Sequence, residues 1–356
     1  MKLGTTYVNI APEALKYFVA AIFEGANVPA NEANRVARSL VDSNLRGHDS
    51  HGVVRVRDYV KQLNMGDLKA GVDLEVLNET DAALAVDAKL GFGMVQCDRL
   101  IERLIPKARK QGIACGTMLN SGHVGRLGEW AEVIAAEGLA GMITVNDNGV
   151  LQCVAPPGGT APRISTNPLA IGVPTSNGPA VLDISTSSVA NGKVKVALVA
   201  GQQCPPGWLQ DADGNPTTDP AVRFSDPRGT LLPMGGEQGY KGFGLGLFLD
   251  LLVGGLTGGF CPPAPENAPG TNNVLLLIWD AKRFSGHTHF QTEVDKLLEH
   301  VRETPRKPGV EEIRLPGDRS AAVCEERNEH GIPLDAGTWD RLVRTAGELS
   351  VSVPTI

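Results

Sequence analysis

Two histidines and three arginines lie within the sixteen residues from Asn44 to Tyr59, in a chain that contains only seven histidines. A histidine can transfer protons near neutral pH, and an arginine can hold a carboxylate through two parallel hydrogen bonds. The segment therefore predicts a site that binds a small anion and moves a proton, with His48, His51 and Arg55 as its candidate residues. The alternative is a solvated loop at a helix end, since loops also carry charge for solubility.

A second cluster runs from Asn120 to Trp130, between a predicted strand and a predicted helix. His123 would lie at the carboxyl end of that strand, where α/β sheets commonly bind ligands. The glycines beside it allow close backbone approach, and the N-terminus of the following helix favours an anion. His123 is therefore a candidate for proton transfer, and the alternative is a histidine that is hydrogen-bonded into a loop.

Two further segments have weaker signals for nucleotide binding. Asp183 follows an apolar strand and precedes hydroxyl side chains, which can bind ribose or phosphate, although such residues are more often turn and cap residues. The glycine-rich segment 235–246 contains Lys241, which can contact a phosphate, while its glycines can equally serve helix packing. This segment matches neither a Walker loop nor a Rossmann fingerprint, and neither pattern occurs elsewhere in the sequence.

A metal site is the alternative interpretation of His48 and His51, because their HxxH spacing could bring two imidazoles onto one ion. The thiol or carboxylate ligands that usually complete such a site are missing from any recognisable spacing, so we predict no metal. His287 and His289 are interpreted as loop residues rather than ligands.

Composition limits the class of protein. The chain has 356 residues, 42% of them hydrophobic and 21% charged, which is ordinary for a globular protein with a sizeable core. Its formal net charge of -7 disfavours a nucleic-acid partner, and no apolar run is long enough to predict a membrane span. The N-terminus has no signal-peptide pattern, and the six cysteines form no CxxC, so we expect a cytoplasmic protein with reduced thiols.

Hydrophobic periodicity predicts an α/β fold with a mostly buried sheet. We expect strands at 82–86, 113–119, 141–145, 180–184 and 274–279, and helices at 12–25, 94–111, 126–137, 247–253 and 337–349. A further helix, capped by Asn31, should run toward Gly47, and a polar loop should follow Pro305. The segments 1–75 and 305–356 are expected to form a helical domain, and 76–304 an α/β domain that binds cofactor and substrate.

Several motifs together resemble the malate/L-lactate dehydrogenase family of the second, non-Rossmann type. The matching pieces are GHDSHGVVRVRDY at 47–59, NSGHVGRLGEWAE at 120–132, VAPPGG at 154–159, STNPLAIGVPT at 165–175, LDISTS at 182–187, GYKGFGLGL at 239–247, LPGD at 315–318 and GIPLDAGTW at 331–339. They span nearly the whole chain and look most similar to the hydroxycarboxylate dehydrogenase B branch.

The resemblance implies a non-Rossmann α/β fold and reversible hydride transfer between NAD(P) and a 2-hydroxy acid. It also implies a homodimer in which a second subunit helps to form the cofactor cleft. His123 matches the general acid/base of the family, His51 lies near the nicotinamide, and Arg55 matches a contact to the substrate carboxylate. Other matches line the cofactor (Asn120, Ser121, Asp183, Ile184, Ser185, Lys241, Pro316, Gly317 and Asp318) or the substrate (His48, Tyr59 and Thr166).

Three alternatives stay open from the sequence. Relatives of this fold also reduce cyclic imine carboxylates, whose carboxylate Arg55 would bind equally well. A metal-dependent lyase or hydrolase could use His48 and His51, and a binding protein without catalysis is the third reading. We expect NAD rather than NADP, because Asp183 would repel a 2'-phosphate if it reaches that ribose.

Overall fold

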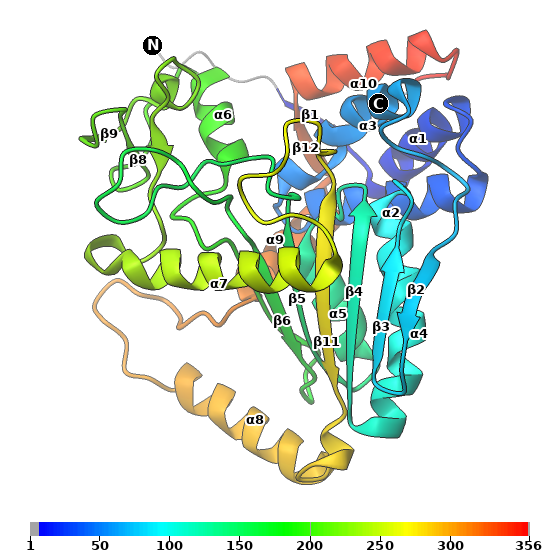
Figure 1. Cartoon of the computed structure of the whole chain (residues 1–356), viewed down its shortest axis with the longest axis vertical. Coiled ribbons are helices and arrows are strands. Elements are labelled where there is room, and N and C mark those ends of the chain that lie inside the picture. The colour runs from blue at the N-terminus through cyan, green and yellow to red at the C-terminus, as the bar shows by residue number, and fades with distance from the viewer. Residues whose placement is uncertain (1–6, 200, 355–356) are drawn as a thin grey trace.

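A seven-stranded mixed sheet forms the centre of the protein, in a computed structural model that describes residues 7–199 and 201–354. Its strand order is β2-β3-β4-β11-β5-β6-β7, and every neighbouring pair is antiparallel except β3 with β4 (Figure 1). The strands are β2 (Glu75–Glu79), β3 (Ala83–Asp87), β4 (Ile113–Ser121), β11 (Asn272–Trp279), β5 (Ala140–Asn146), β6 (Leu169–Val173) and β7 (Ala180–Ile184). The strands at the middle of the sheet are apolar and mostly buried, whereas β2 at its edge is exposed.

Helices cover both faces of this sheet. Figure 1 shows α7 (Tyr240–Thr257) in front of it, with α4 (Gly93–Gln111) and α5 (Leu127–Ala136) behind. The buried residues of α4 recur at helical spacing, including Leu100, Ile101 and Leu104, so one face of the helix meets the sheet. Close packing fixes this position, since a side chain at Gly116 on β4 would overlap Leu104.

The two ends of the chain pack together beside the sheet. β1 (Tyr7–Ile10) pairs antiparallel with β12 (Ile332–Asp335), and Phe18 meets Trp339 at a ring-centroid distance of 5.7 Å. The helices of this part are α1 (Pro12–Gly25), α2 (Ala30–Leu45), α3 (Val56–Met65), α9 (Asp318–His330) and α10 (Ala336–Glu348). Apolar side chains of all these helices except α9 join those of the sheet in one continuous core. The division into two domains at residues 75 and 305 stays a prediction.

A smaller lobe carries a core of its own. It contains a three-stranded sheet of order β10-β8-β9, formed by β8 (Leu209–Gln210), β9 (Pro216–Thr217) and β10 (Thr230–Leu231). The helix α6 (Asn191–Val199) contributes Val194 to this core. α8 (His287–Arg302) is more peripheral and has no buried residue.

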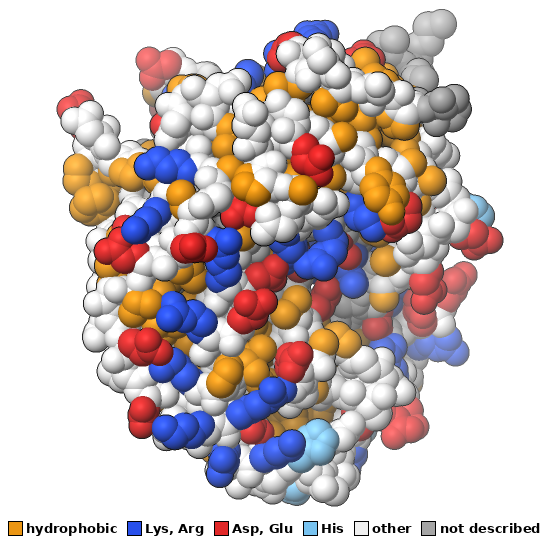
Figure 2. Space-filling view, turned by 90° about the vertical axis from the view of Figure 1, so that its right-hand side faces the viewer, with side chains coloured by type: hydrophobic (Ala, Val, Ile, Leu, Met, Phe, Trp, Pro, Cys, Tyr) orange, Lys and Arg blue, Asp and Glu red, His pale blue; other side chains and the backbone are white. Residues whose placement is uncertain are grey.

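Surface charges are mixed on the face drawn in Figure 2, where acidic and basic side chains are interspersed with apolar ones. Among the described residues, no helix is both long and apolar enough to cross a membrane. All six cysteines are free, and three of them, Cys97, Cys153 and Cys204, are buried.

The predicted strands and most predicted helices are confirmed, but three local predictions are wrong. Asn31 does not cap α2, because the helix already begins at Ala30 after Pro29. The region after Pro305 is not a loop throughout, since it contains α9. His287 lies at the first position of α8, and His289 also belongs to that helix rather than to a loop.

Candidate active site

His51 and His123 stack on each other with ring centroids 5.6 Å apart and ring planes 23° from parallel. His51 ends the short 3-10 helix η1 (Asp49–His51), and His123 follows the end of β4. Residues 72 positions apart in the sequence thus meet at one edge of the sheet. The two histidine motifs, which are far apart in the sequence, therefore lie together in the folded chain.

The buried Asn44 shapes the turn that carries His51. Its Oδ1 accepts a hydrogen bond from the backbone N–H of Val53 at 2.8 Å, and its Nδ2 donates to Oδ1 of Asp49 at 2.7 Å. A Cβ at Gly52 would overlap the Asn44 side chain, so this position has room only for glycine. The sequence GHDSHG therefore folds into a fixed turn rather than a mobile loop.

The two imidazoles have different partners at Nδ1. Nδ1 of His123 lies 2.7 Å from the Tyr59 hydroxyl and accepts the backbone N–H of Gly125 at 3.3 Å. Because that N–H can only donate, Nδ1 carries no proton, and neutral His123 must carry its proton on Nε2. Nδ1 of His51 lies 3.0 Å from Oγ of Ser50, a hydroxyl that can either donate or accept.

Burial and positive charge keep both imidazoles neutral. Burial, as the largest cause, lowers the pKa of His51 to about 3 together with the positive charge of Arg55 and smaller contributions from His48, Arg126 and Lys193. Burial also lowers the pKa of His123 well below its usual value, and Arg55 is again the largest cationic cause. At neutral pH both side chains can therefore accept a proton.

Arg55 presents a guanidinium beside this pair. It lies on the 3-10 helix η2 (Val53–Arg55), and its Nε donates to the carbonyl oxygen of Ser50 at 2.9 Å. Among the described residues, the ion-pair partner of its terminal nitrogens is the exposed Asp58, at the long distance of 4.0 Å. The guanidinium can therefore still bind a carboxylate with two hydrogen bonds.

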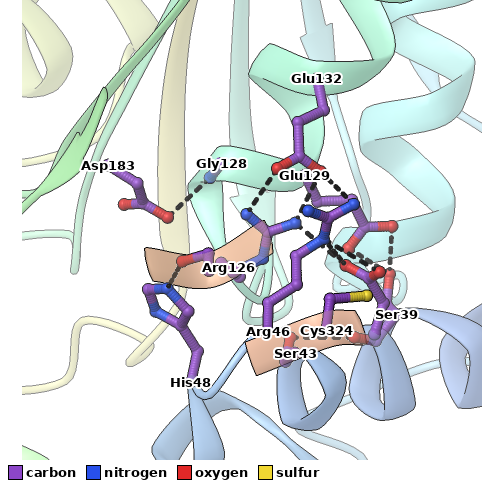
Figure 3. Close-up of polar contacts among 12 residues, drawn as sticks. Ser39, Ser43, Arg46, His48, Arg126, Gly128, Glu129, Glu132, Asp183 and Cys324 are labelled. Atoms are coloured by element: carbon purple, nitrogen blue, oxygen red, sulfur yellow. Dashed lines mark hydrogen bonds and ion pairs between the residues drawn. The ribbon is translucent and has the colours of Figure 1, made fainter. Parts of the chain in front are cut away.

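A pocket of about 280 Å³ lies on the other side of the same turn. It brings together five of the residues expected from the sequence: His48, Asp183, Ile184, Pro316 and Gly317. His48 lies beside α9 in Figure 3, and its Nε2 is 3.4 Å from Oγ of Ser320. Burial lowers the pKa of His48, which Asp183 partly offsets. The mixture of apolar walls and a few polar groups is typical of a small-molecule site.

Arg126 forms the back of this pocket, held by carboxylates (Figure 3). It is 3% exposed and pairs with Asp42 at 2.9 Å and Glu132 at 2.8 Å. Asp183 is fixed beside it, since its Oδ2 accepts the backbone N–H of Gly128 at 2.8 Å in the first turn of α5. Asp183 therefore caps a helix, which was the structural alternative from the sequence. It also lines the pocket.

The remaining expected residues lie outside the lining of this pocket, and their roles stay predictions. Asn120 has a left-handed backbone and donates to Asp87 at 3.1 Å, and Ser121 is fully buried. The Oγ of Ser185 donates to the carbonyl of Ser187 at 3.1 Å. The carbonyl of Thr166 accepts a hydrogen bond from the Thr186 hydroxyl. Lys241 is exposed in the first turn of α7, and Asp318 forms an ion pair with Arg302 at 2.9 Å.

Sequence reasoning missed three polar residues of the site: Ser50, Arg126 and Ser320. Ser50 and Arg126 lie inside the motifs that were singled out, but nothing in their spacing marks them. Ser320 could not be found because α9 was interpreted as loop. In the part of the chain that the structure describes, no group of three or more His, Cys, Asp and Glu side chains could hold a metal ion.

Comparisons with known proteins identify the family of the chain. The family model described as malate/L-lactate dehydrogenase matches residues 10–343. Hydroxycarboxylate dehydrogenase B of Escherichia coli strain K12 is 34% identical over 97% of this chain and 95% of its own. Malate dehydrogenase from Pyrococcus horikoshii OT3 superposes with a TM-score of 0.88 at 28% identity, over 98% of this chain and 97% of its own.

A further similar structure is delta1-piperideine-2-carboxylate reductase from Pseudomonas syringae pvar. tomato. It has a TM-score of 0.81 and 30% identity, over 95% of this chain and all of its own. Relatives of this length and identity share the whole fold rather than a part of it. The chain therefore belongs to the malate/L-lactate dehydrogenase family and is an oxidoreductase.

Proposed function

We propose that this protein interconverts a 2-hydroxy acid and its 2-oxoacid, with NAD as the redox partner. The observation that carries the proposal is the stacked pair of neutral imidazoles beside Arg55. Oxidation of an alcohol removes a hydride from carbon and a proton from oxygen, so the site needs a base at the hydroxyl. An arginine beside that base selects substrates that carry a carboxylate next to the hydroxyl.

Arg55 binds and aims the substrate in this proposal. Its guanidinium holds the carboxylate in one plane and thereby orients the neighbouring carbon. The bound negative charge also offsets the field of Arg55, which is the largest cationic cause of the low pKa at both histidines. Binding of an oxoacid therefore raises both pKa values, so that a histidine can take up from solvent the proton that reduction consumes.

The hydrogen bonds at Nδ1 suggest different roles for the two histidines, one as a hydrogen-bond donor and the other as a base. Sequence reasoning assigned proton transfer to His123, but its neutral form carries the proton on Nε2 and so donates there. His51 can donate its Nδ1 proton to Ser50 and keep a free lone pair on Nε2. We therefore infer that His51 accepts the alcohol proton, while His123 donates a hydrogen bond to the reacting oxygen.

The pocket beside His48 fits part of a nicotinamide dinucleotide, which accepts or gives the hydride when it is bound. Asp183 and Ser320 offer polar atoms to ribose hydroxyls, and Ile184 and Pro316 offer apolar contacts. Gly317 has a left-handed backbone, and a side chain there would approach the Val181 carbonyl at 3.4 Å, so the wall at this point is bare backbone. The carboxylate of Asp183 lines the pocket and favours NAD over the more anionic NADP.

The test is the oxidation of NADH and NADPH with a panel of 2-oxoacids, using wild type, His51→Gln and His123→Gln. Loss of a positioned acid/base group should lower kcat by about 10² to 10⁴. If His51 is the base, His51→Gln also removes the pH dependence of hydroxy-acid oxidation, whereas His123→Gln keeps it. The reverse result returns the base role to His123, and full activity in both variants refutes the site.

A cyclic imine carboxylate is the second candidate substrate, and the similarity to the piperideine-2-carboxylate reductase favours it. Its carboxylate would contact Arg55 in the same way. Turnover of piperideine-2-carboxylate with no turnover of any oxoacid would establish this alternative. A homodimer and a cytoplasmic location stay predictions, which gel filtration and cell fractionation would test.

A further inference from the structure

The backbone that follows His123 is held by side chains from two other elements. The N–H of Val124 donates to Oδ1 of Asn272, the first residue of β11, at 3.2 Å. The carbonyl oxygen of Val124 accepts a hydrogen bond from Nε1 of Trp130 on α5 at 3.0 Å. Both backbone polar groups of Val124 are therefore fixed, one from the sheet and one from the helix behind it.

The carbonyl of Val124 and the N–H of Gly125 belong to the same peptide unit. A trans peptide is planar, so its C=O and its N–H point in opposite directions. While Trp130 holds the carbonyl, the N–H of Gly125 points the other way and donates to Nδ1 of His123 at 3.3 Å. Gly125 completes the turn with a left-handed backbone (φ +76°). The indole and the imidazole thus bind opposite sides of one peptide plane.

Trp130 has a fixed position of its own. Its side chain is fully buried, and the guanidinium of Arg35 lies over its ring, 5.0 Å from the ring centroid. Arg35 pairs in turn with Glu129 at 2.8 Å and with Asp98. Because side chains of α2, α4 and α5 hold the ring in place, its N–H stays directed at the carbonyl of Val124.

The N–H of Gly125 decides which nitrogen of neutral His123 carries the proton. The other group at Nδ1, the Tyr59 hydroxyl at 2.7 Å, can donate or accept, so it fits either tautomer. A backbone N–H can only donate, so it fits only an unprotonated Nδ1. If the peptide plane turned over, the carbonyl of Val124 would face Nδ1 and would favour a proton there. Nε2 would then have no proton to donate.

We propose that Trp130 is a positioning residue that selects the Nε2-protonated tautomer of His123 through the Val124–Gly125 peptide, while Asn272 fixes the peptide before it. A histidine tautomer is often set by a carboxylate or carbonyl that accepts a hydrogen bond from Nδ1. Here a backbone donor sets the opposite tautomer. The inference rests on the proposed function in one respect, since it is there that the Nε2 proton of His123 is donated to the reacting oxygen.

The experiment compares wild type with Trp130→Phe, which keeps an aromatic ring against Arg35 but removes the N–H donor. Trp339→Phe is the matched control, because Trp339 is also buried and packs on Phe18 in the terminal part of the chain. The tautomer is read from the ring ¹⁵N shifts of protein labelled with ¹⁵N-histidine. The chain has only seven histidines, and the spectrum of His123→Gln identifies the signal of His123.

Wild type should show a protonated Nε2 and an unprotonated Nδ1 at His123. Trp130→Phe should show a mixture of both tautomers and lower kcat for oxoacid reduction by about 10- to 100-fold, with the KM for NADH changed by less than about 3-fold. Asn272→Ala, a second variant that leaves the indole in place, should shift the tautomer in the same direction by a smaller amount. Trp339→Phe should change neither the tautomer nor kcat.

Three outcomes would overturn the inference. The first is a proton on Nδ1 of His123 in wild type, the second is an unchanged tautomer in Trp130→Phe, whatever its kcat, and the third is the same tautomer shift in Trp339→Phe. If Trp130→Phe does not fold, an unchanged tautomer in Asn272→Ala has the same meaning. The spectrum needs no substrate, so failure of the proposed function is seen separately, as a lack of turnover of any oxoacid by wild type. A mixed tautomer with full kcat would refute the donor role of His123 and leave the role of Trp130 in place.

Discussion

Tyr59→Phe tests whether the hydroxyl of Tyr59 positions His123 or contacts the substrate. The hydroxyl lies 2.7 Å from Nδ1 of His123, and the ring is 4% exposed between Phe23 and Phe92. Burial raises the pKa of Tyr59 well above its usual value, so the phenol stays protonated at every working pH. The substitution removes one oxygen atom and keeps the packing of the ring.

The magnitude follows from what remains at Nδ1. Only the hydrogen bond from the Gly125 N–H, at 3.3 Å, would still hold this nitrogen. An under-satisfied buried acceptor costs about 1 to 3 kcal/mol. If this cost falls on the transition state, kcat decreases by about 5- to 140-fold, at about 1.4 kcal/mol per tenfold change. The loss of one net hydrogen bond should lower the free energy of unfolding by about 1 kcal/mol.

The assay is steady-state NADH oxidation with a saturating oxoacid, with urea unfolding alongside. Tyr17→Phe is the matched control, because Tyr17 is 67% exposed on α1. A positioning role predicts a lower kcat with a nearly constant KM. An increase in KM alone would mean that Tyr59 contacts the substrate, as the family resemblance implied, and an unchanged kcat in a folded variant would refute the reasoning about Nδ1.

Three further predictions concern charge. The His51 pKa of about 3 lies below its usual 6.5, so the unfolded chain binds a proton that the folded protein does not, and stability should decrease as the pH falls from about 6.5 toward 3. At pH 5 the resulting loss in the free energy of unfolding is about 2 kcal/mol. His51→Gln should therefore reduce by about this amount the difference between the free energies of urea unfolding at pH 7 and at pH 5. Arg126→Met removes the buried partner of Asp42 and Glu132, which keep their ion pairs with Arg46 at 3.2 and 3.3 Å, so the free energy of unfolding should decrease by about 1.5 to 3 kcal/mol; an unchanged value in urea unfolding would contradict this. Asp183→Asn keeps the cap on α5 but removes a pocket charge, so the ratio of kcat/KM for NADPH to that for NADH should increase, and a constant ratio would exclude a role in cofactor choice.

Long, strongly periodic elements could be predicted from the sequence because their patterns are local. α1 was expected at its observed bounds, and β7 likewise, since apolar spacing alone defines them. α9 was not predicted, because its sequence DRSAAVCEERNEH is polar on almost every face and none of its residues is buried. α7 begins earlier than expected, at Tyr240, because glycines at 242, 244 and 246 made its first turns look like a loop.

In the candidate site, too, local motifs could be recognised from the sequence, whereas contacts between distant segments could not. The residue types of the motifs identified His51, Arg55 and His123, since acid/base and anion-binding groups are recognisable without coordinates. The hydrogen bond from Tyr59 to His123 and the approach of Gly192 to Ser50 join residues 64 and 142 positions apart, and no local pattern carries that information. The role of Asp183 as a helix cap was likewise visible only once α5 had been placed beside β7.

The HxxH spacing that suggested a metal has a different physical meaning in the folded chain. In a regular 3-10 helix, side chains three positions apart lie above one another, which would bring both imidazoles onto one face. His48 precedes η1 with a non-helical backbone (φ −98°, ψ 54°), so its side chain leaves in another direction. It enters the pocket with Asp183, while His51 stacks on His123. One turn, fixed by Asn44, therefore holds both a wall of the pocket and His51, so the proposed hydride and proton transfers at adjacent atoms would share one rigid support.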